Sequence, residues 1–179
     1  MSTFNKEHYN SGDGMLTAVW GPPLWHTLHT ISFNYPIKPS KEQKEHYYQY
    51  FKSLEHVLPC RYCRENYKDN LKKLKFGKKH FKDRDTLSKF VYKLHEIINK
   101  NLGKQSGLTF FEVRDRYEYF RARCLNDSKK NEITDKIEKG CTTPLYGVKS
   151  KCLLNIVPKT SKKKTLTIDS KCQIKNKNN

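Results

Sequence analysis

The stretch DTLSKFVYKLHEIINKNLGK, residues 85–104, decides the fold of this chain. Its apolar residues recur every four positions, which is the spacing that lines one face of an α-helix. The stripe consists of Phe90, Leu94, Ile98 and Leu102. Asp85 ahead of the stripe predicts the helix N-cap, and Gly103 behind it predicts the end of the helix. We therefore expect an amphipathic helix here, with its stripe packed against partner helices.

Four other segments carry helical spacing or helix-boundary residues, and hardly any stretch alternates with a period of two. The Pro22–Pro23 pair fits the start of a helix. Ser40 with Gln43, and Thr109 with Glu112, match the capping box that opens a helix. The expected helices span residues 22–35, 40–58, 60–77, 85–102 and 109–120. The sequence thus predicts an all-α fold built as a small helical bundle.

The composition excludes several classes of protein. The chain has 179 residues, with 36 Lys and Arg against 18 Asp and Glu, for a formal net charge of +18. A mean hydropathy of −0.91 without a long apolar run excludes a transmembrane helix, and no N-terminal stretch is typical of a signal peptide. An aromatic content of 12% excludes a disordered chain. We expect a flexible N-terminal segment (1–18), a folded domain (19–124) and a Lys-rich C-terminal extension with little regular structure (125–179).

The strongest local signal is the Cys-x-x-Cys formed by Cys60 and Cys63 at the expected start of a helix. Free backbone N–H groups and the positive end of the helix dipole favour a thiolate there, and Arg61 and Arg64 add positive charge. This pattern predicts an exchange-competent thiol pair. The alternatives are half of a zinc site, a structural disulfide or coincidence. A zinc site needs a second paired element, which the sequence lacks, so we expect no metal.

Two helical segments combine rings with polar side chains. Trp25 and His29 lie one helical turn apart, as do His95 and Asn99. An aromatic stripe on a helix is often plain core packing, and a single buried His is often a satisfied core residue. The pairing of His95 with Asn99 beside Phe90, with a basic Lys104 at the helix end, favours instead a site for an aromatic, anionic ligand.

Taken in order, these motifs resemble the Erv/ALR family of FAD-linked sulfhydryl oxidases. The matching positions are Gly21, Trp25, Leu28 and His29, then Tyr35 and Pro36, then Cys60 and Cys63, then His95, Ile98, Asn99, Leu102, Gly103 and Lys104. The match spans about residues 20–124. The resemblance implies a four-helix bundle with a short fifth helix, which holds FAD and is commonly a homodimer. It implies the reaction 2 R-SH + O2 giving R-S-S-R + H2O2, with protein dithiols as substrates.

The resemblance also assigns roles to single residues. Cys63 would lie against the isoalloxazine ring, and Cys60 would exchange with incoming dithiols. The implied cofactor-binding residues are Gly21, Pro22, Trp25, His29, Tyr35, Phe90, His95, Ile98, Asn99, Leu102, Lys104 and Tyr117. Lys104 would meet the pyrophosphate, with Arg114, Arg116, Arg121 and Arg123 as further candidates. The chain departs from the family pattern at Glu96, where Asn is usual, and at Phe90, where Trp is usual.

The C-terminal extension leaves alternatives open. Cys124, Cys141, Cys152 and Cys172 can pair in three ways, either as a structural staple or as a relay that feeds electrons to Cys60. The compact size and Lys-rich tail are most similar to family members from large DNA viruses, which implies a place in the host cytoplasm and the virion. The rival function is a basic nucleic-acid-binding protein, and the tail of an oxidase could also bind nucleic acid or an acidic partner.

Overall fold

The computed structural model describes residues 5–123, 140–163 and 168–172. The chain divides into two compact units, residues 1–107 and residues 108–179, and each is described here by itself. Among the described residues, no helix combines the length and the apolar character needed to cross a membrane. The expected boundaries of the folded domain, after residue 18 and after residue 124, stay a prediction.

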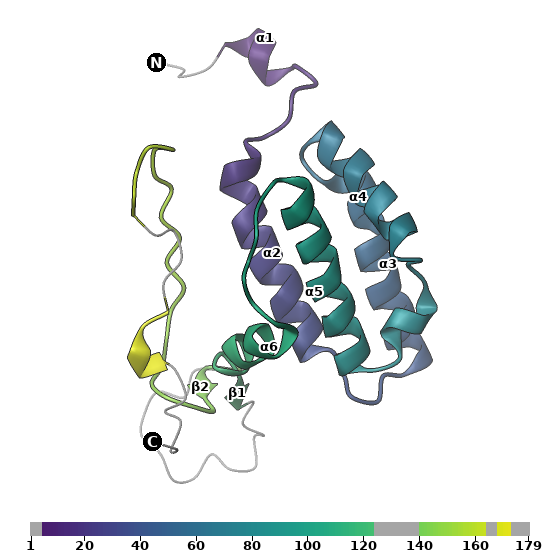
Figure 1. The fold of residues 1–179 in the computed structure, drawn as a ribbon, viewed down its shortest axis with the longest axis vertical. Coiled ribbons are helices and arrows are strands. Elements are labelled where there is room, and N and C mark those ends of the chain that lie inside the picture. The colour runs from purple at the N-terminus through teal and green to yellow at the C-terminus, as the bar shows by residue number, and fades with distance from the viewer. Residues whose placement is uncertain (1–4, 124–139, 164–167, 173–179) are drawn as a thin grey trace. The chain divides into compact units, whose positions relative to one another are not determined.

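The first unit is a four-helix bundle, as predicted (Figure 1). Its elements are α1 (Lys6–Tyr9), α2 (Thr17–Asn34), α3 (Lys41–Val57), α4 (Arg61–Lys73), the 3-10 helix η1 (Lys78–Phe81) and α5 (Arg84–Asn101). Helix α2 packs along α5, and α3 packs along α4. Helix α5 also contacts α4 and η1, so it joins the two helix pairs.

The second unit contains the short fifth helix, α6 (Phe110–Glu118). It also contains a two-stranded antiparallel ladder of β1 (Ala122–Arg123) and β2 (Thr143–Pro144), and the 3-10 helix η3 (Ser170–Cys172). The strands pair Ala122 with Pro144 and Arg123 with Thr143. Beyond β2 and η3, the described part of the C-terminal extension has no helix or strand, which agrees with the expectation of little regular structure.

The core of the bundle is aromatic and aliphatic. Its most deeply buried side chains include Leu28, Tyr35, Phe51, Phe81, Leu87, Phe90, Val91 and Leu94. Buried tyrosines keep their hydroxyls satisfied: Tyr35 donates to the Phe81 carbonyl and Tyr67 to the Phe51 carbonyl, both at 2.9 Å. A buried hydroxyl without a partner would cost free energy, and these two hydrogen bonds remove that cost for the tyrosines in the core.

The apolar stripe on α5 is buried only in its first half. Phe90 and Leu94 are buried, whereas Ile98 is half-buried and Leu102 is 59% exposed. Residues four apart advance about 40° beyond a full turn of an α-helix, so a stripe with this spacing winds around the helix. Leu102 has therefore rotated away from the core that Phe90 enters.

Helix boundaries agree with the local signals at three positions. Ser40 and Gln43 form a complete capping box, and so do Thr109 and Glu112. Gly103 follows the C-cap of α5 and takes the left-handed conformation, with φ +65°. Around that glycine the N–H of Lys104 donates to the Asn99 carbonyl at 2.8 Å and the N–H of Gly103 donates to Lys100 at 3.1 Å, the Schellman pattern.

The N-cap of α5 is Asp83, and the prediction of Asp85 was wrong. The backbone N–H and the hydroxyl of Thr86 both donate to Asp83 Oδ1, at 2.8 and 2.7 Å. Asp85 lies in the first turn of the helix and forms an ion pair with Lys89. Both aspartates precede the stripe. The two hydrogen bonds that Thr86 donates make Asp83 the N-cap.

Helix α4 stops at Lys73, earlier than the predicted end at Gly77. Lys75 takes the left-handed conformation with φ 50°, and the N–H of Phe76 donates to the Leu71 carbonyl at 2.9 Å. This is again a Schellman closure, here with a lysine in the position that glycine usually takes. The turn carries Phe76 against the core.

Helix α2 begins at Thr17, so the prediction that it starts at Pro22 was wrong. Pro22 and Pro23 lie inside the helix, and Gly21 precedes them there. Prolines lack the N–H that an interior helical position donates, so the first turn needs other support. It comes from residues before the helix: the Trp20 indole Nε1–H donates to the Met15 carbonyl at 3.0 Å, and the Met15 N–H donates to the Pro59 carbonyl at 2.8 Å.

Candidate active site

The two cysteines of the Cys-x-x-Cys lie at the start of α4. Cys60 is the N-cap residue, and its Sγ accepts a hydrogen bond from the Cys63 N–H at 3.3 Å. Both cysteines are free thiols and both are partly exposed. The sequence placed this pair correctly because an N-cap pattern is local.

The two thiols differ in their acidity. Hydrogen bonding from the Cys63 side chain lowers the pKa of Cys60, and the Cys63 N–H and the Thr17 hydroxyl act in the same direction. Burial raises the pKa of Cys63, and its hydrogen bond to Cys60 raises it further, although Thr17 and the charge of Arg64 oppose this. Cys60 therefore ionises first, and the Cys63 thiol donates a hydrogen bond to the Cys60 thiolate. The thiolate is the nucleophilic form of a cysteine, so Cys60 is the reactive member of the reduced pair.

The two arginines of the motif have separate surroundings. Arg64 Nη1 donates to the Leu58 carbonyl at 2.6 Å, which holds its charge at the base of the motif. The Arg61 guanidinium lies over the Tyr62 ring, 4.9 Å from its centroid, and faces Glu65 at 4.0 Å. Arg64 is thus the arginine that acts on the thiols, through its charge on Cys63.

The first residue of α2 and a residue just before that helix also reach the cysteine pair, although no sequence motif points to either. The Thr17 hydroxyl oxygen lies 3.9 Å from Cys63 Sγ. Met15 bonds to Pro59, the residue before Cys60, through its backbone. The segment reads as a flexible lead-in because it has no hydrophobic period, and a backbone contact of this kind leaves no signal in side-chain pattern.

A second cluster forms between α2 and α5 from three of the expected residues. The Trp25 ring stacks on the His95 ring with centroids 4.0 Å apart and an interplanar angle of 4°. His29 Nε2 and His95 Nδ1 are 3.0 Å apart and share a hydrogen bond. His29 is 3% exposed. Two helices that are far apart in sequence thus bring one flat indole and two imidazoles together.

Both histidines of this cluster are held neutral. Burial lowers the pKa of His29 to about 3, and the neighbouring His95 and His26 add to the shift. Burial lowers the pKa of His95 to about 4, with Glu96 opposing the shift and Lys104 adding to it. A hydrogen bond between two imidazoles needs one ring N–H and one bare ring nitrogen, which two neutral rings supply.

The end of α5 carries the remaining polar candidates. Asn99 is half-buried, and its Nδ2 donates to Glu96 Oε1 at 3.2 Å. Glu96 is the residue that departs from the family pattern. It accepts this hydrogen bond from Asn99, which the pattern assigns to cofactor binding. Lys104 is exposed just after the Gly103 turn. A groove of about 460 Å³ lies there, lined by Glu96, Ile97, Lys100, Gly103, Lys104 and Gln105.

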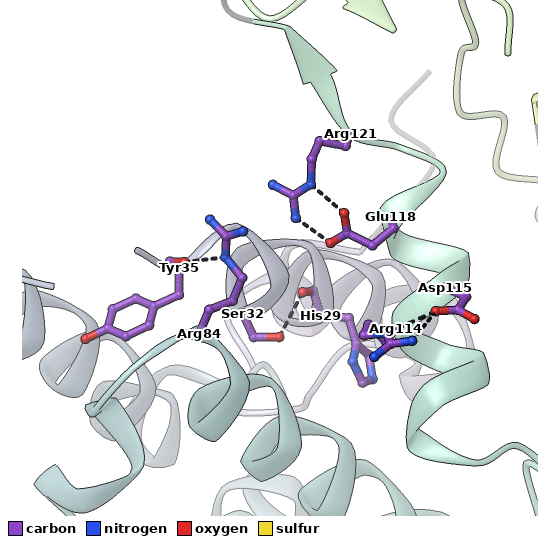
Figure 2. Close-up of polar contacts among 8 residues, drawn as sticks. All are labelled: His29, Ser32, Tyr35, Arg84, Arg114, Asp115, Glu118 and Arg121. Carbon is purple, nitrogen blue, oxygen red and sulfur yellow. Dashed lines mark hydrogen bonds and ion pairs between the residues drawn. The ribbon is translucent and has the colours of Figure 1, made fainter. Parts of the chain in front are cut away.

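Two of the expected cofactor-binding residues, Tyr35 and Phe90, are deeply buried. Tyr35 is fully buried, with its hydroxyl on Phe81 and its carbonyl accepting from Arg84 Nε at 2.6 Å (Figure 2). Phe90 is 2% exposed, and its ring packs against Phe76 and His80, with centroids 5.2 and 4.5 Å away. The structure does not bring either ring to the Trp25 stack. Their burial gives them a packing role.

The other candidates are scattered. Gly21 lies in α2, where an added Cβ would meet only Thr17 Cγ2 at 3.8 Å, and Pro22 beside it is exposed. Ile98 packs against the core, and Leu102 is exposed. Tyr117 belongs to α6 in the second unit, where its ring meets Phe120 edge to face and burial raises its pKa.

Two arginines of the second unit, Arg114 and Arg121, form ion pairs with nearby carboxylates. Arg114 Nε and Nη2 donate to Asp115 Oδ1 at 3.0 and 2.9 Å (Figure 2). Arg121 forms a two-point ion pair with Glu118, at 2.6 and 2.5 Å. Each of these cations already has a carboxylate partner, so it is less available to bind a phosphate.

The described cysteines of the extension are in two states. Cys141 is disulfide-bonded, whereas Cys152 and Cys172 are free. Cys124 lies outside the described residues. Across residues 5–123, 140–163 and 168–172, no group of three or more His, Cys, Asp or Glu side chains is arranged to hold a metal ion.

Comparisons with known proteins bear on the family and the fold. The model of the Erv1 / Alr family matches residues 22–118. A probable FAD-linked sulfhydryl oxidase of Acanthamoeba polyphaga mimivirus is 36% identical over 117 residues, which are 65% of this chain and 78% of that protein. The mitochondrial FAD-linked sulfhydryl oxidase ERV1 of Saccharomyces cerevisiae is 26% identical over 95 residues, or 52% of this chain and 49% of that one. The crystal structure of the yeast Erv1 core superposes with a TM-score of 0.52 at 21% identity, covering 65% of this chain and 92% of the other, which supports the fold.

Proposed function

The chain belongs to the Erv1 / Alr family, and from that premise we propose that it is an FAD-linked sulfhydryl oxidase. Its substrates are protein dithiols and molecular oxygen, and the balanced reaction is 2 R-SH + O2 giving R-S-S-R + H2O2. Cys60 and Cys63 are the catalytic pair. The observation that carries the proposal is the placement of Cys60 as the N-cap of α4, with Cys63 N–H and the Thr17 hydroxyl favouring its thiolate.

Thiol–disulfide exchange at this pair follows from that geometry. In the oxidised pair, a substrate thiolate attacks Cys60 Sγ, the Cys60–Cys63 bond breaks, and Cys63 leaves as a thiolate. The second substrate thiolate then attacks the mixed disulfide, the substrate disulfide forms, and Cys60 leaves as a thiolate. The substrate has lost two electrons and the pair has gained them. The N-cap hydrogen bond from Cys63 N–H stabilises Cys60 as a leaving group, and the charge of Arg64 favours the Cys63 thiolate.

The residues around the Trp25 stack suit a flavin dinucleotide. A bound FAD supplies a two-electron acceptor that returns its electrons to oxygen. Trp25 and His95 supply flat rings, and the buried His29 supports them through its hydrogen bond to His95. Both imidazoles are neutral, so they add no charge beside an aromatic ligand. Asn99 adds amide hydrogen bonding, and Lys104 supplies a cation suited to a pyrophosphate. These five residues would hold the cofactor.

Cys63→Ala tests the catalytic assignment. We expect the variant to lose oxygen consumption with dithiothreitol while it retains the visible flavin spectrum, because the proposed binding residues are untouched. Cys152→Ala is the matched control, since Cys152 is an exposed free thiol in the second unit, and it should keep its activity. Full activity of Cys63→Ala would remove the pair from the mechanism. A wild-type protein that stays colourless after reconstitution with FAD would overturn the proposed function.

The proposal extends to assembly and location. Homodimerisation is supported by the family resemblance, and light scattering of the purified protein tests it. A place in the host cytoplasm and the virion of a large DNA virus is supported by the similarity to the mimivirus protein. The matched relatives are oxidases, which lends no support to the alternative of a nucleic-acid-binding protein. The basic extension remains available for an acidic partner, and oxidation of a protein substrate with and without residues 126–179 tests its part.

A further inference from the structure

We propose that the Gly14–Thr17 segment positions the redox pair. The backbone of the segment holds Cys60 at the N-cap of α4, and its Thr17 hydroxyl contacts Cys63. The inference rests on the proposed function in taking Cys60 and Cys63 as the redox pair. Neither the family motifs nor the hydrophobic pattern points to this segment, which reaches the cysteines only in the folded structure.

The first observation is a close backbone approach. The Met15 N–H donates to the Pro59 carbonyl at 2.8 Å. A Cβ added to Gly14 would lie 2.8 Å from that same carbonyl oxygen and 3.1 Å from Cys60 Cα. Only a residue without a side chain fits at this distance, because both neighbours are backbone atoms that cannot swing aside. Gly12, two residues earlier, has no atom within 4 Å of the equivalent point.

The second observation is that the segment is anchored without being buried. The Trp20 indole N–H donates to the Met15 carbonyl at 3.0 Å, so the segment is tied to α2 on one side and to Pro59 on the other. The side chains of Met15 and Leu16 are 70% and 76% exposed. Hydrophobic burial therefore does not explain why the segment lies there. What the contact does is hold the backbone of Pro59 and Cys60 in place.

The third observation concerns the Thr17 hydroxyl. Two other threonines of the same helix, Thr27 and Thr30, donate to the carbonyl four residues back, at 2.9 and 2.8 Å. Thr17 opens α2, and its hydroxyl oxygen lies instead 3.9 Å from Cys63 Sγ, within reach of a hydrogen bond to sulfur. The hydroxyl contributes to the lowered pKa of Cys60, and it opposes the rise that burial causes in the pKa of Cys63.

Gly14→Val tests the backbone contact, with Gly12→Val as its matched control. The readout is the rate at which iodoacetamide alkylates Cys60 in the full-length, reduced protein without oxygen, followed by peptide mass spectrometry across pH. Displacing Cys60 weakens the N-cap bond to its sulfur, so in Gly14→Val the half-maximal pH should rise by roughly 0.5–1 unit, or about 3- to 10-fold slower alkylation at neutral pH. Gly12→Val should match the wild type. Equal profiles for both variants would overturn the positioning role.

A second pair of variants keeps the test decisive if Gly14→Val does not fold. Thr17→Val removes the hydroxyl and keeps the shape, so the half-maximal pH for Cys60 and for Cys63 should rise. Thr17→Ser should restore the wild-type profile, and Thr30→Val should leave it unchanged. An unchanged profile in Thr17→Val, or failure of Thr17→Ser to restore it, would refute the role of Thr17. Alkylation needs no turnover, so this failure is distinct from failure of the oxidase assignment, which Cys63→Ala reports.

Discussion

Acid should destabilise the flavin-free bundle well above the pH at which its carboxylates protonate, because of His29 and His95. Their pKa values are held at about 3 and about 4, below the 6.5 of an ordinary histidine. Between those limits the unfolded chain binds protons that the folded chain excludes. The stabilising contribution is therefore complete above pH 6.5 and is lost as the pH falls toward 4.

The expected loss is large for a domain of this size. Between pH 7 and pH 5, linkage over these pKa differences gives about 2 kcal/mol for each histidine, or about 4 kcal/mol for the two. Whole domains are stable by about 5–15 kcal/mol, so the acid effect would consume a substantial share. The carboxyl groups of Asp83 and Glu55 have lowered pKa values and stay ionised in this window. Histidines thus dominate the change.

Urea unfolding at pH 7, 6 and 5 measures this loss of unfolding free energy. The proteins compared are the flavin-free wild type, His95→Asn and His8→Gln. The wild type should lose at least about 4 kcal/mol of unfolding free energy over this range, and His95→Asn about 2 kcal/mol less than the wild type. His8→Gln is the control, because His8 is exposed on α1 and should leave the wild-type slope intact. His80, whose pKa burial also lowers, contributes equally to all three proteins. A wild-type change below about 1 kcal/mol, or equal slopes for wild type and His95→Asn, would refute the reasoning.

Three further predictions concern stability, each read from urea unfolding at pH 7. Tyr35→Phe should cost about 1–2 kcal/mol, because it leaves the buried Phe81 carbonyl without the Tyr35 hydroxyl; a neutral result would mean that water replaces the hydroxyl. Phe90→Ala should cost about 3–5 kcal/mol if the ring is core packing against Phe76 and His80, and the flavin spectrum should survive in the molecules that fold. Lys75→Gly should stabilise the protein by about 0.5–1 kcal/mol, since it relieves a non-glycine residue at φ 50°, and a loss of stability would contradict the strain.

Local signals predicted most of the fold. The capping boxes at Ser40 and Thr109, the glycine after the end of α5, and Cys60 as the N-cap of α4 all involve partners within five residues. Bonds of that range form whenever the segment becomes helical, whatever it packs against. At the start of α5 the local signal was misleading: the sequence predicted Asp85 as the N-cap, but the backbone N–H and the hydroxyl of Thr86 both donate to Asp83.

The start of α2 shows how a long-range contact changes a helix boundary. The Pro22–Pro23 pair is a good helix start, and nothing local extends the helix backward to Thr17. Support for the extra turn comes through Met15, which bonds to Pro59 more than forty residues away in the chain. That contact is between backbone atoms, and backbone atoms are the same in every residue, so the pattern of side chains carries no trace of it.

The sequence by itself determined the helices, the thiol pair at a helix start and the set of rings from which we propose that a cofactor site is built. Tertiary structure alone decided which members of that set meet. It stacked Trp25 on His95 and bonded His95 to His29, and it buried Tyr35 and Phe90 in the core. Residues on one helix face are related by a fixed rotation, which spacing reveals. Which faces of α2 and α5 turn toward each other depends on how all the side chains of the core fit together, and no single segment encodes that.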